Sequence, residues 1–258
     1  FAFYHEKDIS NLPWKTLHID VVIEATGKFK TYELAQQHIL AGAKKVILSA
    51  PPEDEVIKTV VLGVNEHILD GSEGIISNAS CTTNNAAPML KIIDELCGIE
   101  QAYITTVHSY TTDQSLHDQP HKDLRRARGA AQSIVPTTTG AAKALTKIFP
   151  NLEGKIGGCG IRVPVPDGSL TDITCHVKNE VSIETINAAF KKATTTSLKD
   201  IMAYTEDPIV SVDIIGNTHS CVFDSQLTSV IDNLVKIVGW YDNEIGYSSR
   251  LIDLIIFI

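Results

Sequence analysis

Residues 20–49 read DVVIEATGKFKTYELAQQHILAGAKKVILS, and they predict a strand, a helix and a second strand. The β-branched run at 20–24 is typical of a strand. The good helix formers at 32–41 predict a helix that ends at Gly42, and the run at 45–49 predicts the second strand. A strand, a helix of about ten residues and another strand form the repeating unit of a parallel sheet.

Two further apolar runs, at 59–62 and 74–77, continue this pattern. Residues 1–80 are therefore expected to form the trailing part of a doubly wound, Rossmann-type α/β sheet. Such sheets bind ligands at the carboxyl ends of their strands, which is where Thr26-Gly27 and Ser49 fall. Ordinary turn chemistry explains these residues equally well when they are taken alone.

The pattern changes after Ile99, where longer strands and fewer helices are expected. A polar stretch at 109–135 is longer than most loops, and loops of that length are often functional. Ser182 is the expected N-cap of a helix. Residues 81–242 thus predict a second, α+β domain with a largely antiparallel sheet. Its expected strands are 103–107, 158–165, 169–179, 208–215 and 233–241, and its expected helices are 139–149 and 182–194.

The composition is that of a globular protein. Of the 258 residues, 43% are hydrophobic and 21% are charged, and the formal net charge is −9. No stretch approaches the roughly 18 to 20 apolar residues of a membrane span, and the negative charge argues against nucleic-acid or anionic-membrane partners. The five cysteines are odd in number, widely spaced and without a C-x-x-C pair. They favour a reducing, cytoplasmic compartment over a disulfide framework or a metal site.

The candidate nucleophile lies in SNASCTTNN at 77–85, where a strand ends and a helix begins. Cys81 is surrounded by small residues, and a helix N-terminus favours the reactive thiolate. The hydroxyls of Ser80 and Thr82 suit an anion. Since Pro88 follows so closely, either the regular helix starts near Asn85 or its first turns are distorted. A cysteine in this setting is more often structural than catalytic.

A candidate base strengthens the case for catalysis. His108 ends the strand predicted at 103–107, where it can face a cleft. A cysteine with a histidine in reach is an activated nucleophile. A histidine at this position, considered alone, is more often a satisfied core or loop residue.

Polar residues suited to phosphate form the third group of candidates. Arg162 lies in mid-strand between apolar residues, so it must be paired or must face a ligand. Three more arginines, at 125, 126 and 128, cluster in the long polar stretch, where solvated surface or subunit contact is the simpler explanation. The run TTTG at 137–140 offers hydroxyls and N–H groups at the start of a helix.

Taken together, these residues match a known family. The chain resembles phosphorylating, type I glyceraldehyde-3-phosphate dehydrogenases over nearly its whole length. Six motifs in the family's order make the resemblance specific. They are SNASCTTN at 77–84, HSYT at 108–111, DLRRAR at 123–128, TTTGAAK at 137–143, RVP at 162–164 and WYDNEIGYS at 240–248.

The resemblance implies an activity and roles for particular residues. It implies NAD-dependent oxidation of glyceraldehyde 3-phosphate in glycolysis, with inorganic phosphate releasing 1,3-bisphosphoglycerate from a Cys81 thioester and His108 as the base. It also implies a homotetramer and no metal. The residues that match the family's phosphate sites are Ser80, Thr82, Thr139 and Gly140 for inorganic phosphate, and Thr111, Arg162 and the nearby Arg128 for the substrate. Those that match cofactor contacts are Thr26, Gly27, Ser49 and Asn243.

The resemblance further implies three regions and one departure. Residues 1–80 correspond to the C-terminal part of the NAD-binding domain, 81–242 to the catalytic domain, and 243–258 to a helix that packs back on the first domain. The family's G-x-G-x-x-G turn, which cradles the pyrophosphate, does not occur. Both ends look cut, so we expect an N-terminally truncated chain that binds NAD poorly.

Four alternatives stay open on the sequence. Erythrose-4-phosphate dehydrogenase shares the nucleophile motif, although Thr111 in HSYT favours the three-carbon substrate. Aspartate-semialdehyde dehydrogenase shares the cysteine but not the WYDNEIGY run. An inactive fragment that acts only as a binding protein is the third alternative. The fourth, a cysteine hydrolase, would need no nicotinamide.

Overall fold

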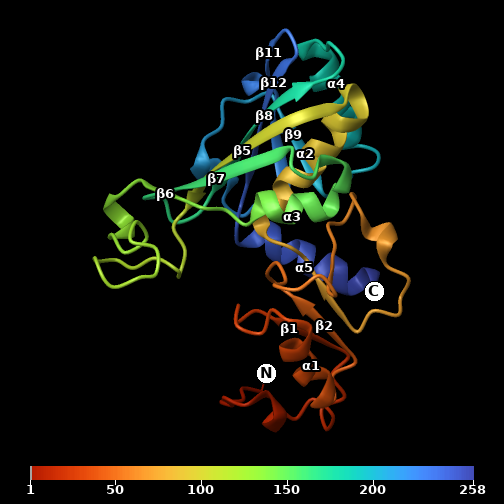
Figure 1. Ribbon diagram of the computed structural model, residues 1–258, viewed down its shortest axis with the longest axis vertical. Helices are drawn as coiled ribbons and strands as arrows, with labels where there is room; N and C mark the ends of the chain where they lie inside the picture. The colour runs from red at the N-terminus through yellow and green to blue at the C-terminus, as the bar shows by residue number, and fades with distance from the viewer. Residues whose placement is uncertain (1) are drawn as a thin grey trace. The chain divides into compact units, whose positions relative to one another are not determined.

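The computed structural model describes residues 2–258, which divide into two compact units. Unit 1 holds the residues up to Ser80 together with Leu251–Ile258, and unit 2 holds Cys81–Arg250. Each unit is built on a sheet of its own (Figure 1). This α/β architecture, with one parallel and one largely antiparallel sheet, confirms the expected fold class.

Unit 1 contains a four-stranded parallel sheet in the order β1-β2-β4-β3. Thr31 caps α1 by accepting a hydrogen bond from the Leu34 N–H at 3.3 Å. Gly42 ends that helix with φ at 113°, and a side chain there would meet the Lys15 backbone at 2.5 Å. The elements are β1 (Val21–Glu24), α1 (Tyr32–Leu40), β2 (Lys45–Leu48), β3 (Lys58–Thr59) and β4 (Ile75–Ser77).

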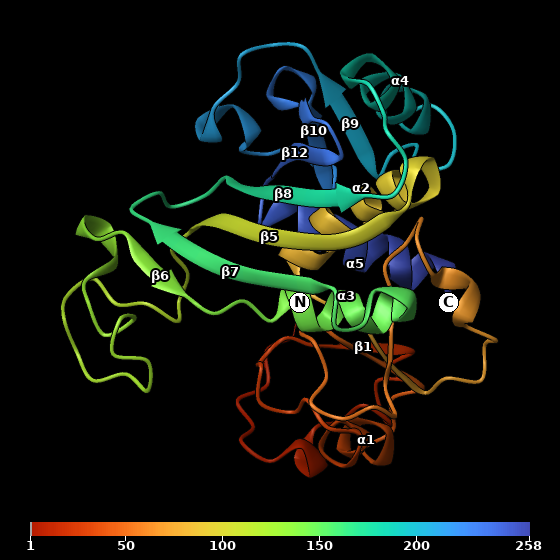
Figure 2. The same ribbon diagram turned by 45° about the horizontal axis from the view of Figure 1, so that its top comes forward.

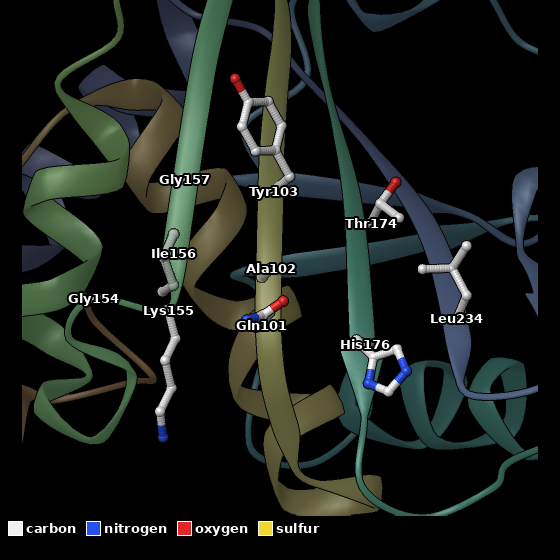
Figure 3. A pocket seen from close by; sticks show the side chains of 10 residues that line it. All are labelled: Gln101, Ala102, Tyr103, Gly154, Lys155, Ile156, Gly157, Thr174, His176 and Leu234. Atoms are coloured by element: carbon white, nitrogen blue, oxygen red, sulfur yellow. The ribbon is translucent and has the colours of Figure 1, made fainter.

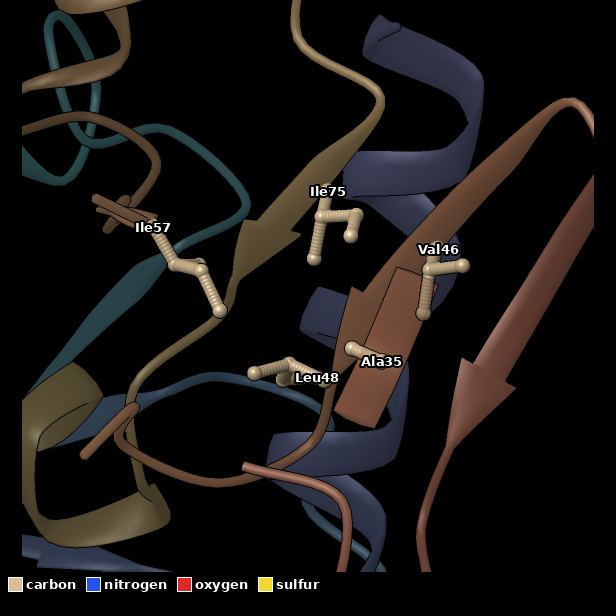
Figure 4. Close-up of a cluster of buried hydrophobic side chains, with 5 residues drawn as sticks. All are labelled: Ala35, Val46, Leu48, Ile57 and Ile75. Carbon is tan, nitrogen blue, oxygen red and sulfur yellow. The ribbon is translucent and has the colours of Figure 1, made fainter. Parts of the chain in front are cut away.

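Buried aliphatic side chains hold α1 against this sheet. Figure 4 shows Ala35 from the helix beside Val46 and Leu48 of β2, with Ile75 of β4 and Ile57 completing the cluster. Ala35 and Val46 have no exposed surface. The small alanine lets the helix approach the sheet closely, so the β1-α1-β2 unit packs as the sequence predicts.

Unit 2 contains a mixed sheet in the order β6-β7-β5-β8-β12-β10-β9, with β11 paired to β12. Neighbouring strands run antiparallel except in the β5/β7 and β9/β10 pairs. The strands are β5 (Ile99–Ser109), β6 (Val135–Thr137), β7 (Ile156–Val163), β8 (Ser169–Val177), β9 (Met202–Thr205), β10 (Cys221–Asp224), β11 (Ser229–Ile231) and β12 (Leu234–Tyr241).

Helices cover one face of the unit 2 sheet. Figure 2 shows α2 (Cys81–Cys97) and α3 (Ala141–Ile148) beside β5, β7 and β8, with α4 (Ile183–Ala193) near β9. Ser182 caps α4 by accepting from the Thr185 N–H at 3.2 Å, as expected. Helix α5 spans Ile245–Phe257. Short 3-10 helices lie at Ile9–Asn11, Glu66–Ile68, Ala130–Gln132, Pro150–Leu152, Ser211–Ile214 and Ser225–Leu227.

One sequence expectation needs correction, and one alternative that the sequence left open is excluded. The strand expected at 208–215 is wrong, because this segment forms a 3-10 turn over Ser211–Ile214. The Asp213 carboxylate accepts the Val210 N–H at 2.8 Å, which closes the turn and leaves Val210 56% exposed. Helix α2 begins at Cys81 and continues through Pro88, so a helix start near Asn85 is excluded. Burial of nearly every residue in the first turns offsets the hydrogen bond that proline removes.

Candidate active site

Cys81 is the first residue of α2, so its sulfur lies at the positive end of a helix of 17 residues. The side chain is partly exposed. Burial raises the pKa of the Cys81 thiol, whereas the N–H and hydroxyl of Thr82 and the charge of Arg162 act in the opposite direction. A thiol with a raised pKa needs a base before it can act as a nucleophile at neutral pH.

His108 supplies a group in the right position to be that base. Its Nε2 atom lies 3.5 Å from the Cys81 Sγ atom. The imidazole is only 5% exposed, and its ring meets the ring of Tyr241 edge-on, with the centroids 5.9 Å apart. The structure therefore brings together the cysteine and the histidine that the sequence singled out 27 residues apart.

Arg162 lies on the far side of the same imidazole. Strands β5 and β7 are parallel, and their register pairs His108 with Arg162. The Arg162 Nη1 atom is 2.6 Å from His108 Nδ1 and 2.8 Å from the Ser109 carbonyl oxygen. Burial, followed by the charge of Arg162, lowers the pKa of His108 to about 4. His108 is therefore neutral at physiological pH.

A chain of buried hydroxyls links helix α2, which begins with Cys81, to strand β5, which carries His108. The Tyr241 hydroxyl lies 2.9 Å from both Thr82 Oγ1 and Thr106 Oγ1, and Thr106 donates to the Leu170 carbonyl at 3.3 Å. In each of these two contacts of Tyr241, either oxygen can be the donor.

Tyr241→Phe is expected to destabilise the fold by about 1–3 kcal/mol, because it leaves the hydroxyls of Thr82 and Thr106 buried with one partner fewer. Urea denaturation followed by circular dichroism measures this change. Tyr103→Phe is the control, since Tyr103 is 53% exposed, and it should change stability by less than about 0.5 kcal/mol. Equal stabilities for the two variants would show that the hydroxyl chain contributes nothing.

The loop arginines differ from the sequence expectation. Arg128 donates from Nε to Asp118 at 2.8 Å, and its side chain is 67% exposed. Arg126 is the arginine turned toward the site, because its Nε donates to Thr137 at 2.8 Å and its charge contributes to lowering the pKa of His108. The structure therefore places Arg126, not Arg128, near His108.

The remaining phosphate candidates lie at three places along the chain. Thr139 and Gly140 stand at the start of α3, where the Thr139 hydroxyl accepts the Ala141 N–H at 3.2 Å and Gly140 faces open space. Thr111 lies just after the end of β5. Ser80 directly precedes Cys81 and is partly exposed. Their roles in phosphate binding stay predictions.

Asn243 has the chemistry that a nicotinamide carboxamide requires. Its Oδ1 atom accepts from the hydroxyls of Ser109 at 2.8 Å and Ser169 at 2.7 Å, which fixes the orientation of the amide. The amide nitrogen carries two hydrogens and has Glu244 Oε1 at 3.4 Å. The second N–H of the Asn243 amide can therefore donate a hydrogen bond to the carbonyl oxygen of a ligand.

Within unit 1, the carboxyl end of β1 also fits a cofactor. Gly27 has φ at 69°, and a side chain there would meet nothing within 4 Å, so the backbone borders open space. Glu24 fixes this turn by accepting from the N–H of Thr26 at 2.8 Å and from its hydroxyl. The Ser49 N–H donates to the Glu24 carbonyl at 3.0 Å. The fit of a cofactor at this turn rests on the open space beside the Gly27 backbone. The contacts with the cofactor stay predictions.

Two further properties concern the whole described chain. Among the helices of residues 2–258, none is both long enough and apolar enough to cross a bilayer. The same residues contain no group of three or more His, Cys, Asp or Glu side chains arranged to hold a metal ion.

Comparison with known proteins gives one consistent result. The family model for the C-terminal domain of glyceraldehyde 3-phosphate dehydrogenase matches residues 80–243. A glyceraldehyde-3-phosphate dehydrogenase of Mycobacterium avium is 58% identical over 95% of this chain and 72% of its own length. Glyceraldehyde-3-phosphate dehydrogenase 2 of Streptomyces avermitilis is 54% identical over 99% of this chain and 76% of its own length. The chain therefore belongs to the glyceraldehyde-3-phosphate dehydrogenase family.

Proposed function

We propose that this chain is an NAD-dependent oxidoreductase of glycolysis. It converts D-glyceraldehyde 3-phosphate and inorganic phosphate into 1,3-bisphosphoglycerate. The observation that carries the proposal is the 3.5 Å separation of Cys81 Sγ from His108 Nε2, with Arg162 on the other side of the imidazole. Family membership supports the same activity.

The first half of the reaction uses the catalytic pair. The Cys81 sulfur bonds to the aldehyde carbon, and the thiol proton passes by way of His108 to the carbonyl oxygen, giving a hemithioacetal and a neutral imidazole. His108 then removes the proton of the new hydroxyl, and the Cys81 N–H, at the helix terminus, stabilises the negative oxygen. When bound, NAD would supply the acceptor for the hydride that this carbon loses. A thioester on Cys81 remains.

The second half transfers the acyl group to inorganic phosphate. A phosphate oxygen bonds to the thioester carbon, the carbon–sulfur bond breaks, and Cys81 leaves as a thiolate. The start of α3, with Thr139 and Gly140, supplies N–H groups that suit this phosphate. The arginines Arg126 and Arg162 suit the phosphate that the substrate carries throughout.

NADH formation tests the proposal. The assay contains glyceraldehyde 3-phosphate, NAD and inorganic phosphate, with erythrose 4-phosphate in parallel, and follows NADH absorbance. The chain is assayed alone and joined to the segment of the Mycobacterium avium relative that the match leaves uncovered. Phosphate-dependent turnover that favours the triose supports the proposal. A preference for erythrose 4-phosphate would shift the assignment to the four-carbon substrate, and no turnover in either form would favour a binding protein.

Arg126→Gln is expected to raise KM for the triose phosphate by roughly ten- to a hundredfold, the effect of losing one hydrogen bond to a charged group. Arg128→Gln is the matched control in the same loop and should change KM less than about twofold, because its exposed pair with Asp118 contributes little. Steady-state kinetics on both variants decide the point. The opposite ranking would restore Arg128 as the phosphate residue.

We also propose that the protein is cytoplasmic and assembles into a homotetramer. The face of the unit 2 sheet opposite α2 supports self-association through a hollow of about 450 Å³ (Figure 3). Tyr103 and Leu234 border this hollow and are 53% and 42% exposed. Light scattering should give the mass of four chains, and Tyr103→Glu should lower it. A monomer at all protein concentrations would contradict the assembly.

A further inference from the structure

Two buried polar side chains of unit 1 lie beside the turn that follows β1. Glu24 is 5% exposed, and His38 of α1 is 4% exposed. The Glu24 Oε2 atom lies 3.0 Å from the His38 Nε2 atom. On the other side of the imidazole, the Nδ1 atom lies 3.1 Å from the indole nitrogen of Trp14. Three segments that are separate in the sequence thus meet in one row of hydrogen bonds.

The hydrogens in this row can be placed from the chemistry of the groups. An indole N–H can only donate, so His38 Nδ1 accepts from Trp14. The neutral imidazole then carries its hydrogen on Nε2 and donates it to the Glu24 carboxylate. Among residues 2–258, neither ring nitrogen has a further hydrogen-bond partner that would ask for the other tautomer. The hydrogen bonds therefore run in one direction, from Trp14 through His38 to Glu24.

The second oxygen of the same carboxylate holds the turn. Glu24 Oε1 accepts from the N–H of Thr26 at 2.8 Å and from its hydroxyl, and that hydroxyl accepts the Lys28 N–H at 3.2 Å. Burial acts to raise the pKa of the Glu24 carboxyl, but the hydrogen bonds from His38 and Thr26 outweigh it and leave the pKa below its usual value. Both oxygens of this buried charge thus have donors, as a buried carboxylate requires.

Gly27, at the centre of the turn, has a backbone donor to spare. The N–H groups of its neighbours Thr26 and Lys28 are used inside the turn. The Gly27 N–H has no hydrogen-bond partner among residues 2–258, and the residue is exposed beside open space. A fully satisfied buried network rigidifies the backbone that it touches. The row of buried side chains therefore fixes an exposed turn whose remaining donor is available to a ligand.

We propose that Trp14, His38 and Glu24 are positioning residues, a relay of hydrogen bonds that holds the Gly27 N–H in place for an acceptor oxygen of the dinucleotide cofactor. Without His38, the Glu24 carboxylate loses a donor and no longer holds Thr26 in one geometry. The identity of the ligand as NAD rests on the proposed function. The direction of the relay does not.

Nitrogen NMR of isotopically labelled histidine tests the direction of the relay without any ligand, because protonated and unprotonated ring nitrogens have well-separated shifts. The signal of His38 among the nine histidines is the one that disappears in His38→Gln. At neutral pH its Nε2 should be protonated and its Nδ1 unprotonated. A hydrogen on Nδ1 would overturn the proposal, because the Trp14 N–H would then have no acceptor.

A pair of substitutions tests whether the three side chains act together. In Glu24→Gln the amide oxygen stays with the Thr26 N–H, so the amide N–H₂ faces His38 and drives the imidazole hydrogen onto Nδ1, against the Trp14 N–H. Trp14→Phe removes that N–H. Each single variant should lower the thermal midpoint of unfolding, and the double variant should be no less stable than Glu24→Gln. A double variant that loses the sum of the two single effects would overturn the relay.

Binding of NAD tests the role of the relay at the turn. Titration of the chain with NAD, followed by the Gly27 amide signal in NMR, detects even millimolar affinity. His38→Leu should raise Kd by roughly three- to tenfold, the effect of one neutral hydrogen bond. His38→Gln keeps an acceptor for Trp14 and a donor for Glu24, so it should restore most of the affinity. An unchanged Kd in His38→Leu would overturn the proposal.

His67→Leu is the matched control, because it removes an exposed histidine from the same unit, and it should leave Kd unchanged. If His38→Leu fails to fold, the comparison moves to Glu24→Gln, which should bind NAD more weakly than its double variant with Trp14→Phe. The reverse order would overturn the proposal. No binding of NAD by the unchanged chain would overturn the choice of ligand, whereas the histidine tautomer and the paired substitutions would still decide the relay.

Discussion

Cys81→Ser is expected to abolish NADH formation, lowering kcat by roughly 10⁴-fold or more, the scale on which enzymes lose activity with their nucleophile. A serine hydroxyl is a far weaker nucleophile than a thiol at neutral pH, and His108 alone does not convert it into an alkoxide. Single-turnover experiments with the triose phosphate should also show no acyl-enzyme by mass spectrometry.

Cys159→Ser is the matched control for this experiment. Cys159 is also free and partly exposed, but it lies on β7 with its sulfur 3.8 Å from the hydroxyl of Thr105. Its replacement should leave kcat within about twofold, as for a typical surface substitution. Substantial turnover in Cys81→Ser, or a comparable loss in Cys159→Ser, would remove Cys81 from its role.

His108→Asn is the second large effect, with an expected loss of about 10² to 10⁴ in kcat from the missing general base. Thiol alkylation should slow as well, because the base that accepts the thiol proton is missing. Increasing the pH should recover part of the alkylation rate by ionising the thiol directly. An alkylation rate equal to that of the unchanged protein at every pH would exclude His108 as the base.

The same variant tests how His108 affects stability. Its pKa is near 4 in the fold and about 6.5 when exposed, so the unfolded chain binds a proton first as the pH falls. Stability from the neutral imidazole is therefore complete above about pH 6.5 and is lost as the pH falls toward 4, by up to about 3 kcal/mol. His108→Asn should show a flatter pH dependence of unfolding over this window. Parallel curves for the two proteins would indicate that His108 does not titrate as proposed.

Residue type and position were enough to predict the fold class and to single out Cys81 and His108, whose catalytic roles stay predictions. Cys81 and His108 each stand where a strand ends, and this location is visible in the hydrophobic pattern. The hydrophobic pattern does not show which arginine of the loop faces the site. Arg126 and Arg128 differ in their acidic partners, Asp113 and Asp118, and only folding of the loop decides which arginine turns inward.

Secondary structure was least predictable where a side chain competes with the backbone. The apolar run at 208–215 reads as a strand, yet the Asp213 carboxylate takes a backbone N–H and closes a turn. The short strands β9, β10 and β11 were missed because each has only three or four residues. At α2 the proline left the start of the helix open, because the sequence does not show that burial of the surrounding residues outweighs the local cost of Pro88.

The pairing of His108 with Arg162 across β5 and β7 has a consequence for insertions and deletions. Side chains alternate between the two faces of a strand, so a shift of β7 by one residue turns its whole set of side chains over. Arg162 would then leave the face of His108, and Ile161 or Val163 would take its place in the ladder. Loss of a single residue upstream in β7 would thus remove the contact between Arg162 and His108 without altering any residue of the site. Loss of two residues would leave Arg162 on the same face of the sheet and move it along the strand by about 7 Å.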